Sequence, residues 1–161
     1  YDHYLRRVYN YMRYRLPDAQ TADDLTAQVF HRALEGLNSY DPQKAPFGAW
    51  LFGIANYVIK DHFRRQQRLS WLSLDSLRQR FSLTVPPEEA AIQSEREASV
   101  LRAVARLNDR EREIVALKFG GSLNNRQIAE LTGLTPSHVG IILYRSMKQL
   151  KATLETQGVS K

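Results

Sequence analysis

Apolar residues recur every three or four positions along most of the chain, which is the spacing of amphipathic helices. The pattern predicts a first helix over residues 1–15, ending before Pro17, and a second that begins near Thr21 and runs to about Asn38. Thr21 followed by Asp24 is typical of a capping box. The apolar positions of the second helix are Leu25, Val29, Phe30, Ala33, Leu34 and Leu37.

A third helix is predicted from Pro46, a residue that suits the first position of a helix, to Arg68. Its first half carries the apolar residues and its second half is basic. The periodicity fails over residues 69–89, where serines and leucines alternate. We interpret this segment as a linker, and its leucines favour a path along the surface of a partner.

Helical periodicity resumes near Pro87 and predicts a helix to Leu107, followed by a short helix over residues 109–119. Gly120 and Gly121 then indicate a turn. In the short helix, Glu111 and Glu113 flank a basic residue and are expected to form a solvated face.

Residues 125–145 have the spacing of a helix-turn-helix. Ala129 falls where two helices cross closely, and Gly133 supplies the positive φ that the turn requires. Val139 and Ile142 hold the second helix from beneath. Such a unit places its second helix in the major groove of duplex DNA, although some helix pairs with this spacing are structural hairpins.

Together these patterns predict an all-α fold made of two small helical domains, the second containing the helix-turn-helix. The predicted boundaries are 1–68 for the first domain, 69–89 for the linker and 90–161 for the second domain. We find no convincing strand pattern and no internal repeat.

Charge favours a polyanionic partner. The 161 residues include 23 Lys and Arg against 17 Asp and Glu, a formal net charge of +6, so the average field attracts nucleic acid. The absence of cysteine excludes disulfides and thiolate metal sites. Apolar runs stay shorter than the roughly 18 residues of a membrane span. We therefore expect a cytoplasmic protein that is not inserted in a membrane.

Catalytic and cofactor motifs are not found in the sequence. The histidines His3, His31, His62 and His138 are scattered one to a segment, so no metal site is predicted. We also find no phosphate-binding glycine loop, serine elbow or carboxylate pair, and predict neither a cofactor nor an enzyme. One alternative is a free-standing helix-turn-helix regulator, which would explain the second half of the chain but not the aromatic and basic third helix.

With both halves in view, the chain resembles the extracytoplasmic-function (ECF) group of the sigma-70 family, the bacterial RNA polymerase sigma factors. In the first half the resemblance rests on Ala22, Asp23, Asp24, Leu25, Thr26, Val29, Phe30, Arg32, Ala33, Phe47, Trp50, Leu51, Ile54, Ala55, Asp61, Arg64 and Arg65. In the second half it rests on the helix-turn-helix and on Leu107, Arg110, Glu111, Arg112, Glu113, Ile114, Val115 and Leu117.

The resemblance implies that the first domain is sigma region 2 and that its second helix docks on the clamp helices of the largest subunit of core RNA polymerase. The residues implied are Asp23, Asp24, Leu25, Gln28, Val29 and Arg32. Leu25 and Val29 are shared with the core, and the two aspartates also suit a helix N-terminus. Many members are held inactive by an anti-sigma factor, which makes such a protein a further candidate partner.

Region 2 of the family also captures the melted minus-ten strand of the promoter. Aromatic faces stack on unpaired bases and cations neutralise phosphates. The candidates here are Lys44, Phe47, Trp50, Asn56, Tyr57, Lys60, Arg64 and Arg65. Trp50 lies in the apolar stripe of the third helix, and this position favours packing in the core over contact with the DNA strand. Tyr57 stands where the family often has Asn, so base preference at that position departs from the family pattern.

The second domain is implied to be sigma region 4, which reads the minus-thirty-five element of promoter DNA as duplex. The candidates for base and phosphate contact are Arg126, Thr135, Ser137, His138, Gly140, Ile141, Tyr144, Arg145 and Lys148. Gly140 and Ile141 replace the family's usual Lys, Ser or Arg. Either Gly140 permits close approach to DNA, with Ile141 touching a thymine methyl, or readout is mostly by shape and phosphate.

Overall fold

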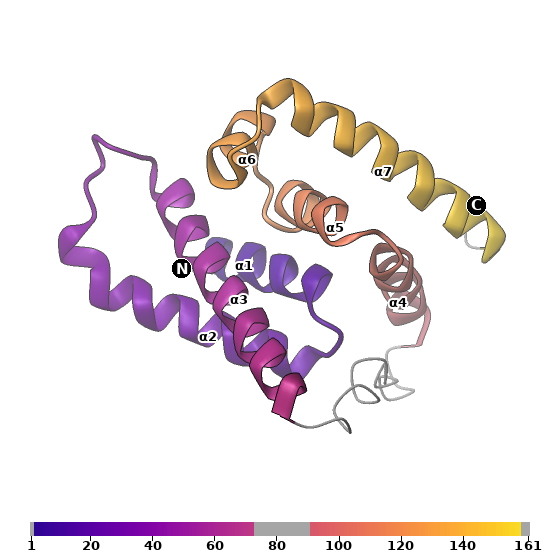
Figure 1. Cartoon of the computed structure of the whole chain (residues 1–161), viewed down its shortest axis with the longest axis horizontal. Coiled ribbons are helices and arrows are strands. Elements are labelled where there is room, and N and C mark those ends of the chain that lie inside the picture. The colour runs from indigo at the N-terminus through magenta and orange to yellow at the C-terminus, as the bar shows by residue number, and fades with distance from the viewer. Residues whose placement is uncertain (1, 73–90, 159–161) are drawn as a thin grey trace.

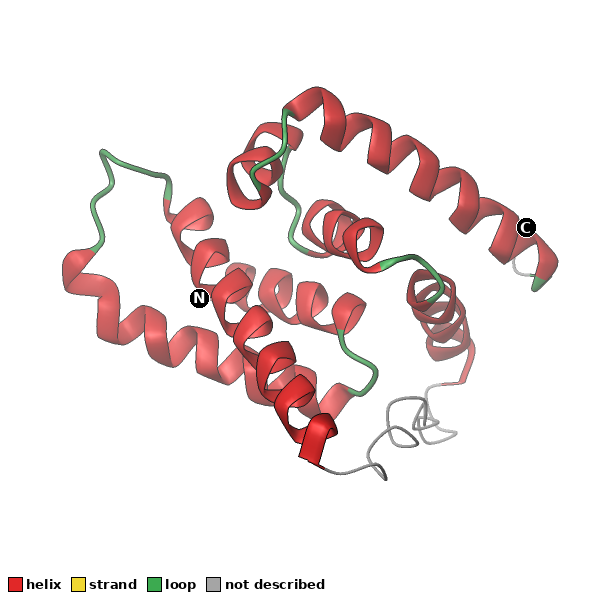
Figure 2. Cartoon of the chain, in the orientation of Figure 1, coloured by secondary structure: helices red, strands yellow, loops and turns green. Residues whose placement is uncertain are grey.

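The structure is a computed structural model that describes residues 2–72 and 91–158 (Figure 1). The N-terminal half contains α1 (Asp2–Arg15), α2 (Ala19–Gly36), the 3₁₀ turn η1 (Leu37–Ser39) and α3 (Phe47–Leu72). The C-terminal half contains α4 (Ala91–Ala105), α5 (Asp109–Val115), the π-helical turn η4 (Ala116–Gly120), α6 (Asn125–Thr132) and α7 (Pro136–Thr156). No strand occurs among the described residues (Figure 2), and the predicted all-α fold is confirmed.

In the N-terminal half, α1, α2 and α3 pack around fully buried side chains such as Val8, Met12, Val29 and Leu51. The predicted apolar stripe of α2 is correct at positions 25, 29 and 33, which are buried. It is wrong at Leu34 and Leu37, which are 73% and 48% exposed. Leu34 directly follows the buried Ala33, and among the described residues no other element covers it, while the helix tightens to a 3₁₀ turn at Leu37.

The start of α2 differs from the predicted capping box. Asp18 is the N-cap, and its side chain accepts hydrogen bonds from the Thr21 backbone N–H at 2.7 Å and from the Thr21 hydroxyl at 2.9 Å. Asp23 and Asp24 lie in the second turn, where the helix dipole has little effect. The prediction that these two aspartates suit the helix N-terminus is therefore wrong.

The helix-turn-helix has the predicted internal geometry. Gly133 ends α6 with φ +75°, and its N–H bonds to the carbonyl of Ala129 at 2.9 Å. Ala129 is 6% exposed, while Val139, on the inner face of α7, is fully buried. Thr135 caps α7 by accepting the backbone N–H of His138 at 3.1 Å.

Part of the predicted linker is helical, because α3 continues to Leu72, four residues past the predicted boundary. Residues 73–89 of that segment lie outside the described residues. The predicted helix start near Pro87 lies outside them as well, and α4 is described from Ala91.

The two halves pack against each other, mainly through α1, with a smaller contribution from α3 (Figure 1). Buried apolar side chains of both halves form one continuous core. Gly120 and Gly121 lie where the chain leaves η4, and both are buried against the N-terminal half. The prediction that Glu113 belongs to a solvated face is wrong, because Glu113 is 7% exposed. Glu113 lies 3.2 Å from Arg110 and 3.9 Å from Lys60 of α3.

Candidate nucleic-acid and polymerase interfaces

The first turns of α7 expose a face opposite the core. Val139 and Leu143 point inward and are buried, whereas Ile141 and Tyr144 are 51% and 65% exposed. The predicted minus-thirty-five residues that are exposed are Arg126, Thr135, Ser137, His138, Ile141, Tyr144, Arg145 and Lys148. A helix with such a face fits the major groove, where polar groups meet base edges and apolar groups meet thymine methyls.

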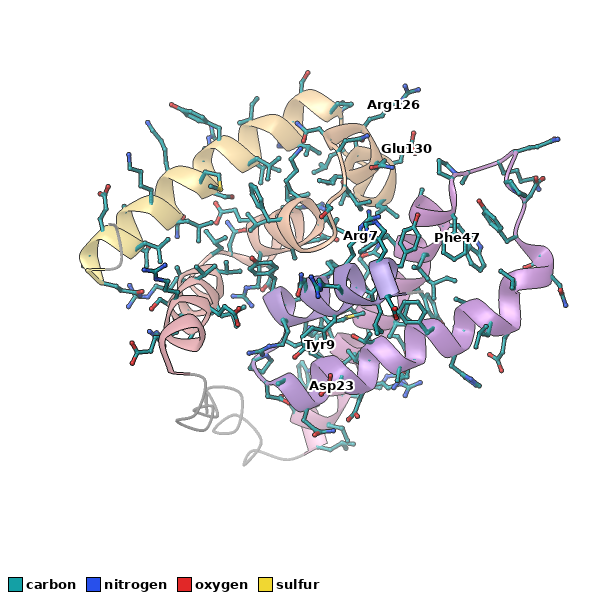
Figure 3. The ribbon with its side chains drawn as sticks, turned by 180° about the vertical axis from the view of Figure 1, so that it is seen from behind. Arg7, Tyr9, Asp23, Phe47, Arg126 and Glu130 are labelled. Atoms are coloured by element: carbon teal, nitrogen blue, oxygen red, sulfur yellow. The ribbon has the colours of Figure 1, made fainter. Side chains whose placement is uncertain are left out.

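Basic side chains flank this face. The Lys148 ammonium lies 5.2 Å from the centre of the Tyr144 ring. Arg126 stands out from α6 at the far end of the helix-turn-helix, beside Glu130 (Figure 3). Its weak pairing with Glu130, at 3.9 Å and with both side chains exposed, leaves the guanidinium open to a phosphate.

Gly140 is the exception among the residues predicted for the duplex. It is half-buried, and a Cβ at this position would stand 3.7 Å from the side-chain nitrogen of Asn125 on α6. A side chain at position 140 would therefore extend toward α6, at ordinary van der Waals distance. The neighbouring Ile141 and Tyr144 carry the exposed face.

Replacing Gly140 by alanine is expected to raise the free energy of unfolding by up to ~1 kcal/mol, because alanine favours a helix interior and the site has room. Thermal unfolding followed by circular dichroism measures the change. Gly133→Ala is the matched control, and it should lose about 1–2 kcal/mol at its left-handed backbone. A lower melting temperature for Gly140→Ala would contradict this account of the site.

A hollow of about 530 Å³ lies on the exposed side of α3 and is lined by Tyr57, Lys60, Phe63, Arg64 and Gln67. Tyr57 is 50% exposed. The guanidinium groups of Arg32 and Arg64 lie 5.2 Å and 6.0 Å from the centre of its ring. The hollow thus combines aromatic surface with cationic groups, as single-stranded nucleic acid requires.

The cations around the hollow are partly paired. Asp61 lies 3.1 Å from Arg65 and 3.8 Å from Arg64, and all three are on α3. Lys60 faces Glu113 of the C-terminal half at 3.9 Å. Asn56 is 9% exposed, so in this arrangement it is buried beside the hollow instead of opening onto it.

Phe47 and Trp50 belong to a different environment from Tyr57. The rings of Phe47, Trp50 and Tyr40 lie 4.9–5.6 Å apart in a half-buried cluster, with Tyr4 of α1 against Phe47. The Tyr40 hydroxyl donates to the carbonyl of Ala45 at 3.0 Å and fixes the turn before α3. The cluster anchors that turn, on which Lys44 is exposed.

The predicted polymerase-binding residues divide into two groups. Asp23, Asp24, Gln28 and Arg32 are exposed along α2. Leu25 and Val29 are buried, which leaves them to the core. Leu34 follows on the exposed side, and the sequence missed it because its position extended a stripe that looked buried.

The α3 helix also carries a pH-sensitive group. Burial lowers the pKa of His62 below its ordinary value of 6.5, and Arg65 lowers it further, whereas Asp18 and Asp61 oppose the shift. The folded chain therefore binds fewer protons than the unfolded chain as the pH falls below 6.5, and stability decreases on acidification.

We expect the melting temperature of His62→Gln to fall less than that of the unmodified chain when the pH is lowered from ~7.5 to ~5.5, because glutamine does not titrate. Thermal unfolding of both proteins at each pH makes the comparison. An equal loss in the two proteins would show that the imidazole does not contribute to the acid sensitivity.

No cluster of His, Asp and Glu with metal-binding geometry occurs within residues 2–72 and 91–158. Over the same residues, none of the helices combines the length and apolar character needed to cross a membrane.

The fold and its exposed faces define a helical DNA-binding protein with a helix-turn-helix in its second half. Comparison with known proteins identifies the family. Residues 1–69 match sigma-70 region 2, and residues 97–150 match sigma-70 region 4. The chain belongs to the ECF group of the sigma-70 family, and the resemblance found in the sequence is confirmed.

Individual relatives agree. The chain is 32% identical to the ECF RNA polymerase sigma factor BldN of Streptomyces coelicolor over 154 residues, which cover 96% of the chain and 58% of that relative. It is 27% identical to SigM of Bacillus subtilis, covering 99% of the chain and 95% of SigM. Because both halves match one family, a free-standing regulator, which explains only the second half, is not favoured.

Solved structures share the fold. The sigma factor RpoE of Bartonella quintana, in complex with the anti-sigma factor NepR, matches with a TM-score of 0.79 at 18% identity, covering 94% of this chain and 91% of that chain. CnrH, in complex with the cytosolic domain of CnrY, matches with a TM-score of 0.63 at 23% identity, covering 96% and 84%.

Proposed function

We propose that the chain directs core RNA polymerase to specific promoters and opens them by capturing the minus-ten strand. One observation carries this proposal. The same chain exposes an aromatic and cationic hollow on α3 and a recognition face on α7, one suited to a single strand and the other to a duplex. Residues 1–68 would act as the first functional unit and residues 90–161 as the second.

Docking on the polymerase is assigned to the exposed side of α2. Asp23 and Asp24 do not cap α2, because Asp18 is its N-cap. Charged groups at the rim of an interface steer association and fix orientation. We assign the contact with the clamp helices of the largest subunit to Asp23, Asp24, Gln28 and Arg32, with Leu34 as an added apolar contact.

Strand capture is assigned to Tyr57 as the stacking residue, with Lys60, Arg64 and Arg65 on the phosphates. Phe47 and Trp50 would shape the loop before α3 instead of stacking themselves, since their rings pack on Tyr40. Opening is then driven by the free energy of base capture and needs no nucleotide hydrolysis. The chain acts in this scheme as a non-catalytic subunit in the cytoplasm.

An anti-sigma factor is a further proposed partner. RpoE and CnrH, which share this fold, were each solved with a protein of that kind or with its cytosolic domain. Such a partner would keep the chain from the polymerase until a signal releases it.

Transcription with purified core enzyme tests the proposal. The chain is mixed with core RNA polymerase and a library of promoter fragments, and the RNA products are sequenced. Specific start sites that depend on the chain are expected. Tight duplex binding without initiation at any fragment would refute the proposal and favour a simple DNA-binding regulator.

A further inference from the structure

Gly140 is a glycine that the fold itself does not require. It lies in the interior of α7, and among the described residues a Cβ there would meet one side-chain atom, the Asn125 nitrogen, at 3.7 Å. Glycine weakens a helix interior relative to alanine, because it has more freedom to lose on folding. Neither the backbone nor the packing accounts for the glycine. A molecule that approaches this part of α7 would account for it.

Gly140 lies at the edge of the recognition face that borders α6. Ser137 and Tyr144, about one turn before and after it, are exposed, whereas Val139 is buried. The α6 helix packs against the start of α7 (Figure 1). In a helix-turn-helix bound to DNA, the first helix crosses the phosphate backbone and the second enters the major groove. The open position at Gly140 would thus lie nearer the phosphates than the base edges.

The atom beside Gly140 is the amide nitrogen of Asn125, the first residue of α6. The Lys118 ammonium donates to the Asn125 Oδ1 at 3.0 Å. This bond holds the amide with its oxygen toward Lys118 and its NH₂ group beside Gly140. Within residues 2–72 and 91–158, the Asn125 Nδ2 donates to no acceptor. An amide NH₂ has two donors, so this group is available to a ligand.

The neighbouring polar side chains of α6 already serve its N-terminus. Asn124 accepts the backbone N–H of Gln127 at 2.9 Å, and the Gln127 side chain accepts that of Asn124 at 3.0 Å. The two side chains form a capping box. Asn125 does not contribute to this cap. Its bond to Lys118 therefore orients the amide without stabilising the helix start.

We propose that Lys118 and Asn125 form a phosphate-binding pair beside Gly140, and that glycine at position 140 lets a DNA phosphate reach the Asn125 amide. The inference rests on the proposed function and names two further residues for its duplex contact. The Lys118 ammonium has three donors, so it can hold the amide and still place positive charge beside the phosphate. The sequence did not indicate these two residues as DNA contacts, because neither belongs to the exposed face of α7.

The first test removes the amide donor and keeps the bond to Lys118. Asn125→Asp retains an acceptor for Lys118, but it loses the NH₂ group and repels a phosphate. The affinity of the full chain for a labelled, mixed-sequence duplex of about 20 base pairs is measured by fluorescence anisotropy. Phosphates are the same in every sequence, so the promoter sequence is not needed. We expect the affinity to fall about 10-fold or more, as for the loss of a hydrogen bond to a charged group.

Gln127→Glu is the matched control for charge. It makes the same change two residues further along α6, and its carboxylate can still accept the Asn124 N–H. Its affinity for the duplex should fall much less than that of Asn125→Asp. Equal losses in the two variants would assign the effect to charge alone and refute the phosphate-binding pair.

Lys118 is tested through the salt dependence of binding, which a purely structural role would not change. Lys118→Gln removes the charge and leaves a polar side chain. The slope of log K against log salt should become shallower by about 0.9, the value for one phosphate contact. Lys151→Gln removes an exposed charge further along α7 and should leave the slope unchanged. An unchanged slope for Lys118→Gln would refute the contact of Lys118 with a phosphate.

Gly140→Ala tests the role of the glycine. The methyl group would cover the Asn125 amide, so duplex affinity should fall about 5-fold or more even though the helix becomes more stable. Since this variant is expected to be stabilised, unfolding cannot explain a loss of binding. Gly53→Ala on α3 is the matched control, because a Cβ there meets no atom within 4 Å, and its duplex affinity should not change. Unchanged or improved affinity for Gly140→Ala would refute the role of the glycine.

Failure of this inference and failure of the proposed function remain distinguishable. Duplex affinity is measured with the free chain, whereas initiation is measured with core polymerase. If the chain initiates transcription and its variants bind the duplex as the unmodified chain does, only the phosphate-binding pair is refuted. If the variants lose affinity as expected and the chain never initiates, only the proposed function is refuted. An unmodified chain without affinity for the duplex refutes the pair, and initiation then decides the proposed function separately.

Discussion

Replacing Tyr57 by alanine is expected to lower the yield of open promoter complexes by about 5- to 150-fold, the equivalent of the ~1–3 kcal/mol that one stacked base contributes. The ring is half exposed at the hollow on α3, and Arg32 and Arg64 flank it. Its removal takes away the stacking surface and leaves the core intact. Permanganate footprinting of a linear promoter with reconstituted holoenzyme measures the open fraction.

Two controls make this result specific. Tyr57→Phe keeps the ring and should retain most of the open complexes. A template with a pre-melted minus-ten segment removes most of the demand for strand capture, so Tyr57→Ala should approach the unmodified protein on it. An open-complex yield for Tyr57→Ala equal to that of the unmodified protein on the linear promoter would show that Tyr57 holds no base.

Reversing the charge of Asp24 is expected to weaken binding to core polymerase by about 30-fold or more, since a lysine facing a cationic partner juxtaposes like charges, which costs several kcal/mol, and ~2 kcal/mol already corresponds to about 30-fold. Asp24 is exposed on α2 and makes one hydrogen bond, from Gln20 at 3.2 Å, so Asp24→Lys should leave the fold intact. Fluorescence anisotropy of the labelled protein with core enzyme gives the dissociation constant.

Glu130→Lys provides the matched control for net charge. It makes the same change of two charges on α6, which Figure 3 shows on the other side of the molecule from Asp23 on α2. This variant should bind core polymerase as the unmodified chain does. Both variants should still bind a minus-thirty-five duplex. Equal weakening of polymerase binding by Asp24→Lys and Glu130→Lys would point to overall charge and not to a docking surface on α2.

Local chemistry made the helix-turn-helix predictable. Gly133 has the positive φ expected of it, and Ala129 and Val139 are buried where the spacing placed them. These features depend on residues within about ten positions of each other along the chain, so the local sequence carries the information. The exposed side of α7 follows from the same periodicity, because side chains that do not meet the core must face outward.

Predictions failed at a helix start and where distant segments met. Thr21 with Asp24 was predicted to begin α2, whereas Asp18 is the N-cap and accepts the Thr21 backbone N–H. Glu113 looked solvated because its neighbours on α5 are charged, yet Lys60 of α3 lies opposite it. The exposure of Leu34 has the same origin, since the position of α1 and α3 decides which edge of α2 is covered.

The order and kind of the helices and the family were readable from the sequence, because propensity, capping and spacing act over a few residues. What only the tertiary structure decided is how the halves meet. Local sequence rules predict only a turn at Gly120 and Gly121. Their role as a contact between the two halves depends on α1 lying against Gly120. Packing between residues more than a hundred positions apart leaves no periodic trace, as the bond between Arg7 and Gly121 illustrates.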